Sequence, residues 1–220
     1  MRALRTAFSV LPIPCGLALC LSVAAPAPAA AAPVVGFTEN WTGTSTHGWG
    51  GGTLVTNPGT GGVGGVGDGF LLLNQAQDGN FGTRSLGAEY VGDWQAAGIQ
   101  HVLFQLNDVG VADNFEIHFA IGNGSNLWQY NQGFTPTNGS WQEFDVDLSV
   151  SSSFTQIIGT GTFADALQNA DRVLIRNDKP PFIQNPDATH GDLGIDRLVL
   201  AGGVTRIAPM TWGRIKRIYR

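Results

Sequence analysis

The chain has 220 residues, of which 43% are hydrophobic and 13% charged, and its formal net charge is −5 at pH 7. This length suits one sizeable β domain, and the many aromatic and β-branched residues exclude a disordered composition. All 17 acidic residues lie between Glu39 and Asp196, and residues 32–205 hold only five basic residues, so that this region carries a net charge of −12. Such an acidic domain argues against a nucleic-acid partner and suits neutral glycans, cations or a basic surface.

Residues 1–31 have the pattern of a secretory signal peptide. Arg2 and Arg5 precede an apolar run, and Ala29 and Ala31 form an A-x-A cleavage site. Both cysteines of the chain lie in this segment, so the mature protein is expected to contain no disulfide. No later stretch is apolar over the ~20 residues that a membrane helix needs. The sequence therefore predicts a secreted, extracellular product without a transmembrane segment.

Residues 32–203 contain short strand-like runs separated by Gly, Asn, Asp and Pro. We expect strands at 34–41, 53–56, 69–74, 84–86, 101–106, 114–121, 127–131, 141–148, 172–176 and 193–200, and one short helix at 163–170. Strands at such regular intervals are typical of an antiparallel β-sandwich. The number of strands and the absence of a Cys…Trp…Cys pattern favour a jelly roll over an immunoglobulin fold.

Residues 204–220 form a basic C-terminal tail with five Lys and Arg residues and no acidic residue. In 211–220 the apolar and basic residues fall on different sides of a short helix, as in segments that bind surfaces. Two interpretations remain open. The tail is either an unstructured terminus or a tag that contacts the cell surface.

The segment 191–200, GDLGIDRLVL, reads as the closing strand, with Asp196 as one acidic residue in an apolar alternation. Its expected partner is the first strand, where Glu39 stands between apolar and aromatic neighbours in FTENW. We expect the two strands to pair and the two carboxylates to meet around a metal ion. The alternative is that the carboxylates are simply solvated or paired with Arg197 or Arg84.

The segment 139–148, GSWQEFDVDL, alternates apolar residues with three carboxylates on the opposite face, namely Glu143, Asp145 and Asp147. This face resembles the active-site strand of laminarinase-type glycoside hydrolases, in which two carboxyl groups about 5 Å apart flank the glycosidic bond. Asp147, however, stands where that family has a glutamate. The other interpretation is a solvated strand face, which antiparallel sheets commonly show.

The same segment is similar to the G-x-W-x-x-[FY]-x-V-x-L strand of carbohydrate-binding modules with the galactose-binding-like jelly roll, and of the related laminin type IV domain. The opening FTENWTGTSTHGW and the closing GDLGIDRLVL also resemble these domains, so the match covers residues 37–200. The resemblance implies a structural calcium held by Glu39 and Asp196. Calcium prefers six to eight oxygen ligands, so backbone carbonyls and Asp68 or Asp192 would complete its shell.

Sugar binding needs aromatic platforms with polar groups beside them. Trp128 and Tyr130 lie two residues apart on one predicted strand, with Asn126 and Gln129 adjacent, and Trp49 lies in a glycine-rich loop where its ring can be exposed. We expect these residues to bind the ligand, and we assign the remaining tryptophans to the core, namely Trp41 and Trp141 in strand patterns and Trp94 before an apolar segment.

The sequence thus predicts a secreted, non-catalytic module that binds a polysaccharide or glycoconjugate. Two alternatives remain. One is a structural or surface-layer protein without a small ligand, and the other is a glycoside hydrolase that uses Glu143 and Asp145.

Overall fold

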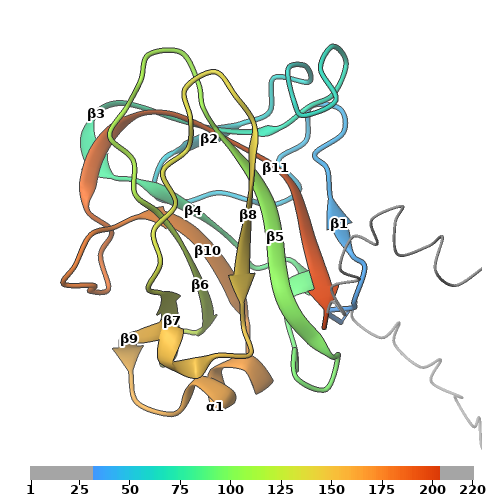
Figure 1. The fold of residues 1–220 in the computed structure, drawn as a ribbon, viewed down its shortest axis with the longest axis vertical. Helices are drawn as coiled ribbons and strands as arrows, with labels where there is room; N and C mark the ends of the chain where they lie inside the picture. Colours follow the sequence, from blue (N-terminus) through green and yellow to red (C-terminus); the bar gives the residue numbers. More distant parts are fainter. Residues whose placement is uncertain (1–31, 204–220) are drawn as a thin grey trace, which may run out of the picture.

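A computed structural model describes residues 32–203, which form two antiparallel sheets packed into a sandwich (Figure 1). One sheet has six strands in the order β2-β3-β11-β5-β8, with β1 paired to β11, and the other has five in the order β4-β10-β6-β7-β9. The jelly-roll β-sandwich predicted from the sequence is confirmed. The predicted signal peptide and basic tail lie outside the described residues.

The strands of the six-stranded sheet are β1 (Thr38–Glu39), β2 (Leu54–Thr56), β3 (Leu71–Asn80), β5 (Ile99–Asp108), β8 (Gln142–Asp147) and β11 (Ala188–Gly202). Those of the five-stranded sheet are β4 (Gly82–Ser85), β6 (Ile117–Asn123), β7 (Asn126–Tyr130), β9 (Phe154–Gly159) and β10 (Arg172–Asn177). Helix α1 (Phe163–Gln168) lies where a helix is expected, and short 3₁₀ turns span Ala88–Tyr90 and Ser151–Ser153. None of the helices within 32–203 is long and apolar enough to cross a membrane.

Each predicted strand has a counterpart, and β9 is an additional strand that the sequence pattern does not indicate. It pairs with β7 at the edge of the five-stranded sheet. Its six residues follow a serine run and bury only Phe154 and Ile157, so its alternation is too short to stand out in the sequence.

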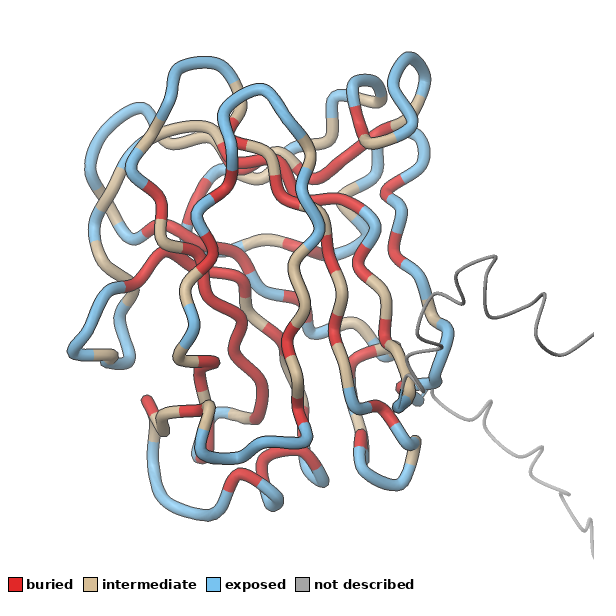
Figure 2. Tube along the Cα trace, viewed as in Figure 1, coloured by how far each residue is buried: buried red, intermediate tan, exposed pale blue. Residues whose placement is uncertain are grey.

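The core fills the space between the sheets, and the strand residues that face it alternate with residues that face outward (Figure 2). Trp41 and Trp94 belong to this core, as expected. The assignment of Trp141 to the core is wrong. Its ring lies partly exposed against Phe70, with ring centroids 5.3 Å apart, and it donates a hydrogen bond to the Gly61 carbonyl. Gly194 makes room for it, since a Cβ there would lie 2.8 Å from the indole.

The expected pairing of the first and last strands is confirmed, because Glu39 lies opposite Leu198. A β-bulge then changes the pattern of β11. Asp196 pairs with Gln105 and Val199 with Leu103, so the register shifts between these two pairs, and Arg197 takes a left-handed backbone with φ 49°. The extra residue keeps Ile195 and Leu198 in the core while Asp196 turns toward the outer face of the sheet.

Candidate functional site

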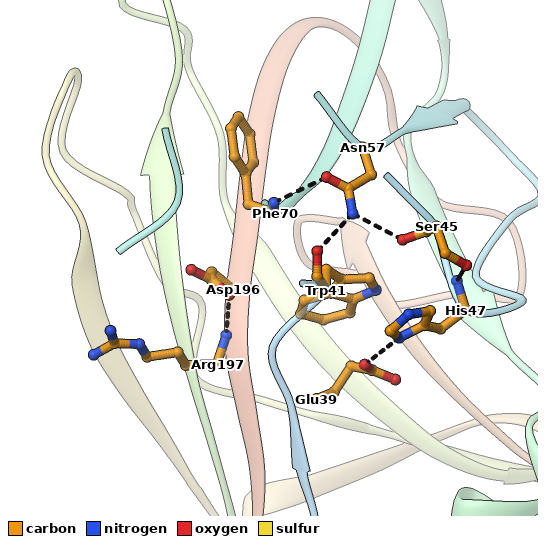
Figure 3. Close-up of polar contacts among 8 residues, drawn as sticks. All are labelled: Glu39, Trp41, Ser45, His47, Asn57, Phe70, Asp196 and Arg197. Atoms are coloured by element: carbon orange, nitrogen blue, oxygen red, sulfur yellow. Dashed lines mark hydrogen bonds and ion pairs between the residues drawn. The ribbon is translucent and has the colours of Figure 1, made fainter. Parts of the chain in front are cut away.

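Glu39 and Asp196, the predicted metal ligands, take part in separate hydrogen-bond networks (Figure 3). The Glu39 carboxylate lies 2.6 Å from Nδ1 of His47 and is 5% exposed as a residue. Asp196 is fully buried and accepts hydrogen bonds from the backbone N–H groups of Val63 and Arg197, at 2.8 and 2.7 Å. The glycine-rich loop at 59–69 therefore folds over Asp196, and Glu39 is held by the loop that follows β1.

Asp68, unlike Glu39, lies beside Asp196 near Gly62. A Cβ placed on Gly62 would lie 2.5 Å from the Gly69 carbonyl oxygen, 2.8 Å from Oδ2 of Asp196 and 3.0 Å from Oδ2 of Asp68. Burial first, and the neighbouring charge of Asp68 further, raise the pKa of Asp196, which the two N–H donors and Arg197 oppose. Two carboxylate oxygens and one carbonyl oxygen thus converge beside a residue that has no side chain.

This arrangement fits a cation only in part. Among residues 32–203, no three Asp, Glu, His or Cys side chains converge in an arrangement that could hold a metal. Calcium would need several more oxygens, and backbone carbonyls are the available source. All three predicted carboxylates already have partners: Asp196 accepts from the N–H groups of Val63 and Arg197, Asp68 accepts from the N–H of Gly64, and Glu39 lies against His47. Asp196 and Asp68 nevertheless lie close together beside the Gly69 carbonyl, whereas Glu39 belongs to a separate network.

The expected exposure of Trp49 is wrong. Although Trp49 lies in a glycine-rich loop, it is only 3% exposed, because its ring packs edge-on against Trp41 and Tyr90 at centroid distances of 5.8 and 5.5 Å. Tyr130 is also buried, 7% exposed, against Phe134 and Phe154. Neither ring offers a face to a ligand in this conformation.

Trp128 is different, because its side chain is partly exposed and lines an open pocket of about 540 Å³. The pocket lies where α1, β7 and β9 meet, at the lower end of Figure 1. Its lining residues are Trp128, Ser151, Ser152, Phe154, Gly161, Thr162, Phe163 and Ala164. The surface therefore combines one partly exposed indole with hydroxyl groups, above the nearly buried rings of Phe154 and Phe163.

Two local devices fix the shape of this pocket. Asn126 accepts a hydrogen bond from Nε1 of Trp128 at 2.8 Å and donates one to the Thr162 carbonyl at 2.9 Å, so it orients the indole. Thr162 and Asp165 form a capping box that begins α1, and hydrogen bonds from Thr162 lower the pKa of Asp165. Phe163, the first residue of the helix, then packs 5.8 Å from Trp128.

Of the predicted ligand residues, the structure thus places Trp128 and Asn126 at one pocket, the latter as a positioning group. The sequence interpretation missed the residues contributed by α1 and by the serine turn. The capping-box spacing of Thr162 and Asp165 before an apolar run is a readable signal for the helix start. Gln129 lies on the opposite side of β7 from Trp128 and is fully buried.

The carboxylates of β8 lie on an edge strand and face outward. Asp145 lies 2.8 Å from Nδ1 of His101, and Asp147 accepts hydrogen bonds from the N–H and hydroxyl groups of Ser149, which lower its pKa. A general acid for glycoside hydrolysis needs a raised pKa instead. Asp147 is therefore poorly suited to that role, and Glu143 is simply exposed.

No family model and no curated protein matches this chain. Among solved structures, the family 11 carbohydrate-binding module from Clostridium thermocellum, in complex with a β-1,3-1,4-mixed-linked tetrasaccharide, is similar over 77% of this chain and 97% of its own, with 21% identity and a TM-score of 0.49. An exo-β-agarase is similar over 77% of this chain and 24% of its own, with 12% identity and a TM-score of 0.48. The CBM22-1-CBM22-2 tandem domain of Paenibacillus barcinonensis Xyn10C is similar over 85% and 50%, with 16% identity and a TM-score of 0.41. With identities this low, the function of this chain has to be inferred from its own residues.

Proposed function

We propose that this chain is a secreted, non-catalytic carbohydrate-binding module whose partner is a polysaccharide or glycoconjugate. The observation that carries the proposal is the pocket at Trp128, where a partly exposed indole is held in place by Asn126 and flanked by serine and threonine hydroxyls. The apolar face of a sugar ring stacks on an aromatic side chain, and its hydroxyls need polar partners at the edge. The acidic character of the domain favours neutral glycans over anionic ones.

The test is affinity electrophoresis of the full chain through gels that contain soluble mixed-linkage β-glucan, xylan or agarose. We expect retardation on at least one of these polysaccharides, and we expect Trp128→Ala to abolish it. Trp141→Ala is the matched control, because it also removes a partly exposed indole but from the other sheet. Equal retardation of Trp128→Ala and the unaltered chain would refute the assignment.

Two alternatives are decided by the same preparations. If a broad glycan array shows no binding, a structural or surface-layer role becomes the better proposal. Release of reducing sugar from any of the polysaccharides would favour a glycoside hydrolase instead.

The proposed module includes a structural calcium ion, held by Asp196 and Asp68 with backbone carbonyls. The buried charge of Asp196 beside Asp68 supports it, since a cation would offset the repulsion between the two carboxylates. Export with removal of residues 1–31, and contact of the basic tail 204–220 with an acidic cell surface, rest on the sequence pattern alone. The mass of the exported protein tests the cleavage, which should leave Ala32 as its first residue.

A further inference from the structure

Three polar side chains on the outer face of the five-stranded sheet are almost completely buried. His118 and Gln129 are 0% exposed and Arg176 is 2% exposed, although the strands that carry them turn their apolar residues toward the core. His118 and Arg176 lie directly opposite each other on β6 and β10. A face of this kind normally meets solvent, so another part of the chain must cover it.

The cover is the segment 179–186, the orange loop that leaves β10 at the left of Figure 1. The ring of Phe182 lies 4.9 Å from the imidazole of His118, and the Arg176 guanidinium donates hydrogen bonds to the carbonyls of Ile183 and Gln184, both at 2.8 Å. Most of the segment is otherwise exposed, as its pale colour in Figure 2 shows, and Ile183 is 55% exposed. One ring and one guanidinium thus attach the cover to the sheet.

Beneath the cover, four polar atoms have no hydrogen-bond partner. They are Nε2 of His118, Nε of Arg176, and both the oxygen and the nitrogen of the Gln129 amide. The Gln129 amide lies next to the Asp178 carboxylate and opposes the rise in pKa that burial causes there, and Nε2 of His118 lies at ion-pair distance, 3.5 Å, from the Glu116 carboxylate. Neither contact has the geometry of a full hydrogen bond. Buried polar groups are nearly always paired in folded proteins, so such a concentration of unpaired atoms calls for a partner that is not part of the closed conformation.

The unpaired atoms are a mixed set of donors and acceptors. Nδ1 of His118 lies 2.8 Å from the Tyr130 carbonyl, which only accepts, so Nδ1 carries a proton, while Nε2 faces the Glu116 carboxylate at 3.5 Å. The Gln129 amide supplies one donor and one acceptor group, and Nε of Arg176 is a donor. Neighbouring hydroxyl groups of a carbohydrate, each a donor and an acceptor, match this set.

An open pocket of about 240 Å³ borders the cover and reaches one member of this set, Arg176. Arg176, Gln184 and Pro186 line it on the side of the cover, and Asn80 and Arg84 line it on the side of β4. Arg84 also lines a second pocket of about 420 Å³ that continues along β4. An extended ligand lying along β4 would therefore reach the edge of the covered set.

We propose that the segment 179–186 is a movable cover, and that an oligosaccharide lying along β4 displaces it and bonds to His118, Gln129 and Arg176. This site is separate from the Trp128 pocket, although its ligand class rests on the proposed function.

The experiment uses the full chain and two single variants of the cover. Phe182→Ala removes the ring that packs on His118, and Ile183→Ala is the matched control, because that side chain is exposed and its carbonyl is retained. The first measurement is the rate at which diethyl pyrocarbonate modifies His118, followed by mass spectrometry, with exposed His190 as the internal reference. We expect Phe182→Ala to raise this rate about fivefold or more, since the population of the open form sets access, and Ile183→Ala to leave it unchanged. An equal rate in both variants and the unaltered chain would overturn the proposal.

The second measurement is binding of cello-, xylo- and agaro-hexasaccharides by calorimetry. Loosening the cover should tighten binding of at least one of them by up to about tenfold, because the apparent dissociation constant falls as the competent form becomes more populated. Adding Gln129→Leu to Phe182→Ala should remove that gain. If Phe182→Ala weakens binding or leaves it unchanged, the segment is not an occluding cover, and the proposal falls.

The two measurements separate this inference from the proposed function. If binding is lost in Trp128→Ala but is unchanged in Phe182→Ala and Ile183→Ala, the proposed function is supported and the proposal of a movable cover is refuted. A gain in Phe182→Ala that survives Trp128→Ala would support the cover, because the two sites are separate, and the loss of retardation in Trp128→Ala alone would then decide on the Trp128 pocket. If no hexasaccharide binds to any variant, the ligand assigned to the covered site is wrong, even where His118 becomes accessible.

Discussion

Replacing Gln129 by leucine should make the protein more stable, which is unusual for a substitution at a fully buried polar residue. Both polar atoms of the Gln129 amide lack a hydrogen-bond partner, and the residue is 0% exposed. Leucine has a similar volume and no polar atom, so the change removes two desolvated groups without leaving a large cavity. It also extends the small apolar cluster of Ala120, Leu127 and Ile157 on the same side of the sheet.

The size of the effect follows from the cost of unpaired polar groups. A buried donor or acceptor without a partner costs about 1–3 kcal/mol. The different branching of leucine costs up to about 1.5 kcal/mol in a packed site. The two groups together would cost about 2–6 kcal/mol, but the contact of the amide with the Asp178 carboxylate already offsets part of this cost. After the branching term is subtracted, the net gain in the free energy of unfolding should be about 1–2 kcal/mol. For a domain of this size, that corresponds to a rise in melting temperature of about 2–8 °C.

The assay is thermal unfolding followed by circular dichroism, with Asn126→Leu as the matched control. Asn126 is a buried amide on the same strand, but its groups are paired with the Thr162 carbonyl, Trp128 and Gln156 at 2.9, 2.8 and 2.6 Å. Its replacement should lower the free energy of unfolding by about 1–3 kcal/mol, because it leaves partners unpaired. If Gln129→Leu lowers the melting temperature as Asn126→Leu does, the Gln129 amide is satisfied in solution and the reasoning about the covered face is wrong.

Three further outcomes are expected. Calcium should raise the melting temperature at pH 7 relative to EDTA, and an unchanged midpoint would contradict the ion. In EDTA, a shift from pH 7 to pH 5 should also raise the melting temperature, because the raised pKa of Asp196 makes the folded state bind a proton more readily than the unfolded chain; an unchanged midpoint there would contradict the raised pKa. Glu143→Gln should leave polysaccharide retardation unchanged, and loss of a measurable hydrolysis would instead show catalysis on β8. Deletion of residues 211–220 should move exported protein from the cell-associated fraction to the medium, and unchanged partitioning would contradict anchoring by the tail.

The fold is predictable because its strands obey a simple period. In β5, Val102, Phe104 and Leu106 alternate with half-buried residues, and this pattern identifies both the strand and its inner face. The bulge of β11 is not predictable in the same way. Arg197 adopts a left-handed backbone that usually favours glycine, and only the pairing with β5 explains why an extra residue is accommodated there.

The site is less predictable, because exposure depends on segments that are distant in the sequence. A glycine-rich loop favours an exposed tryptophan, yet Trp49 is covered because Trp41 and Tyr90 provide an aromatic pocket for it. The amide of Gln129 beside aromatic residues indicates a ligand contact, but the side chain is fully buried and lies against Asp178, which is 49 positions later in the chain. Local patterns therefore identify polar and aromatic groups without showing which of them reach the surface.

Arg176 links the stability of the closed conformation to binding at the covered face. Its guanidinium already bonds to two carbonyls of the cover and to Asp178 at 2.7 Å, while its Nε atom has no partner. A ligand that uses the terminal nitrogens must replace the carbonyls of Ile183 and Gln184, whereas one that uses Nε need not. A ligand that uses the terminal nitrogens competes with the cover for the Arg176 side chain, so its binding releases the cover. Such a ligand shifts the equilibrium between the closed and open conformations only by the difference between its affinities for the two.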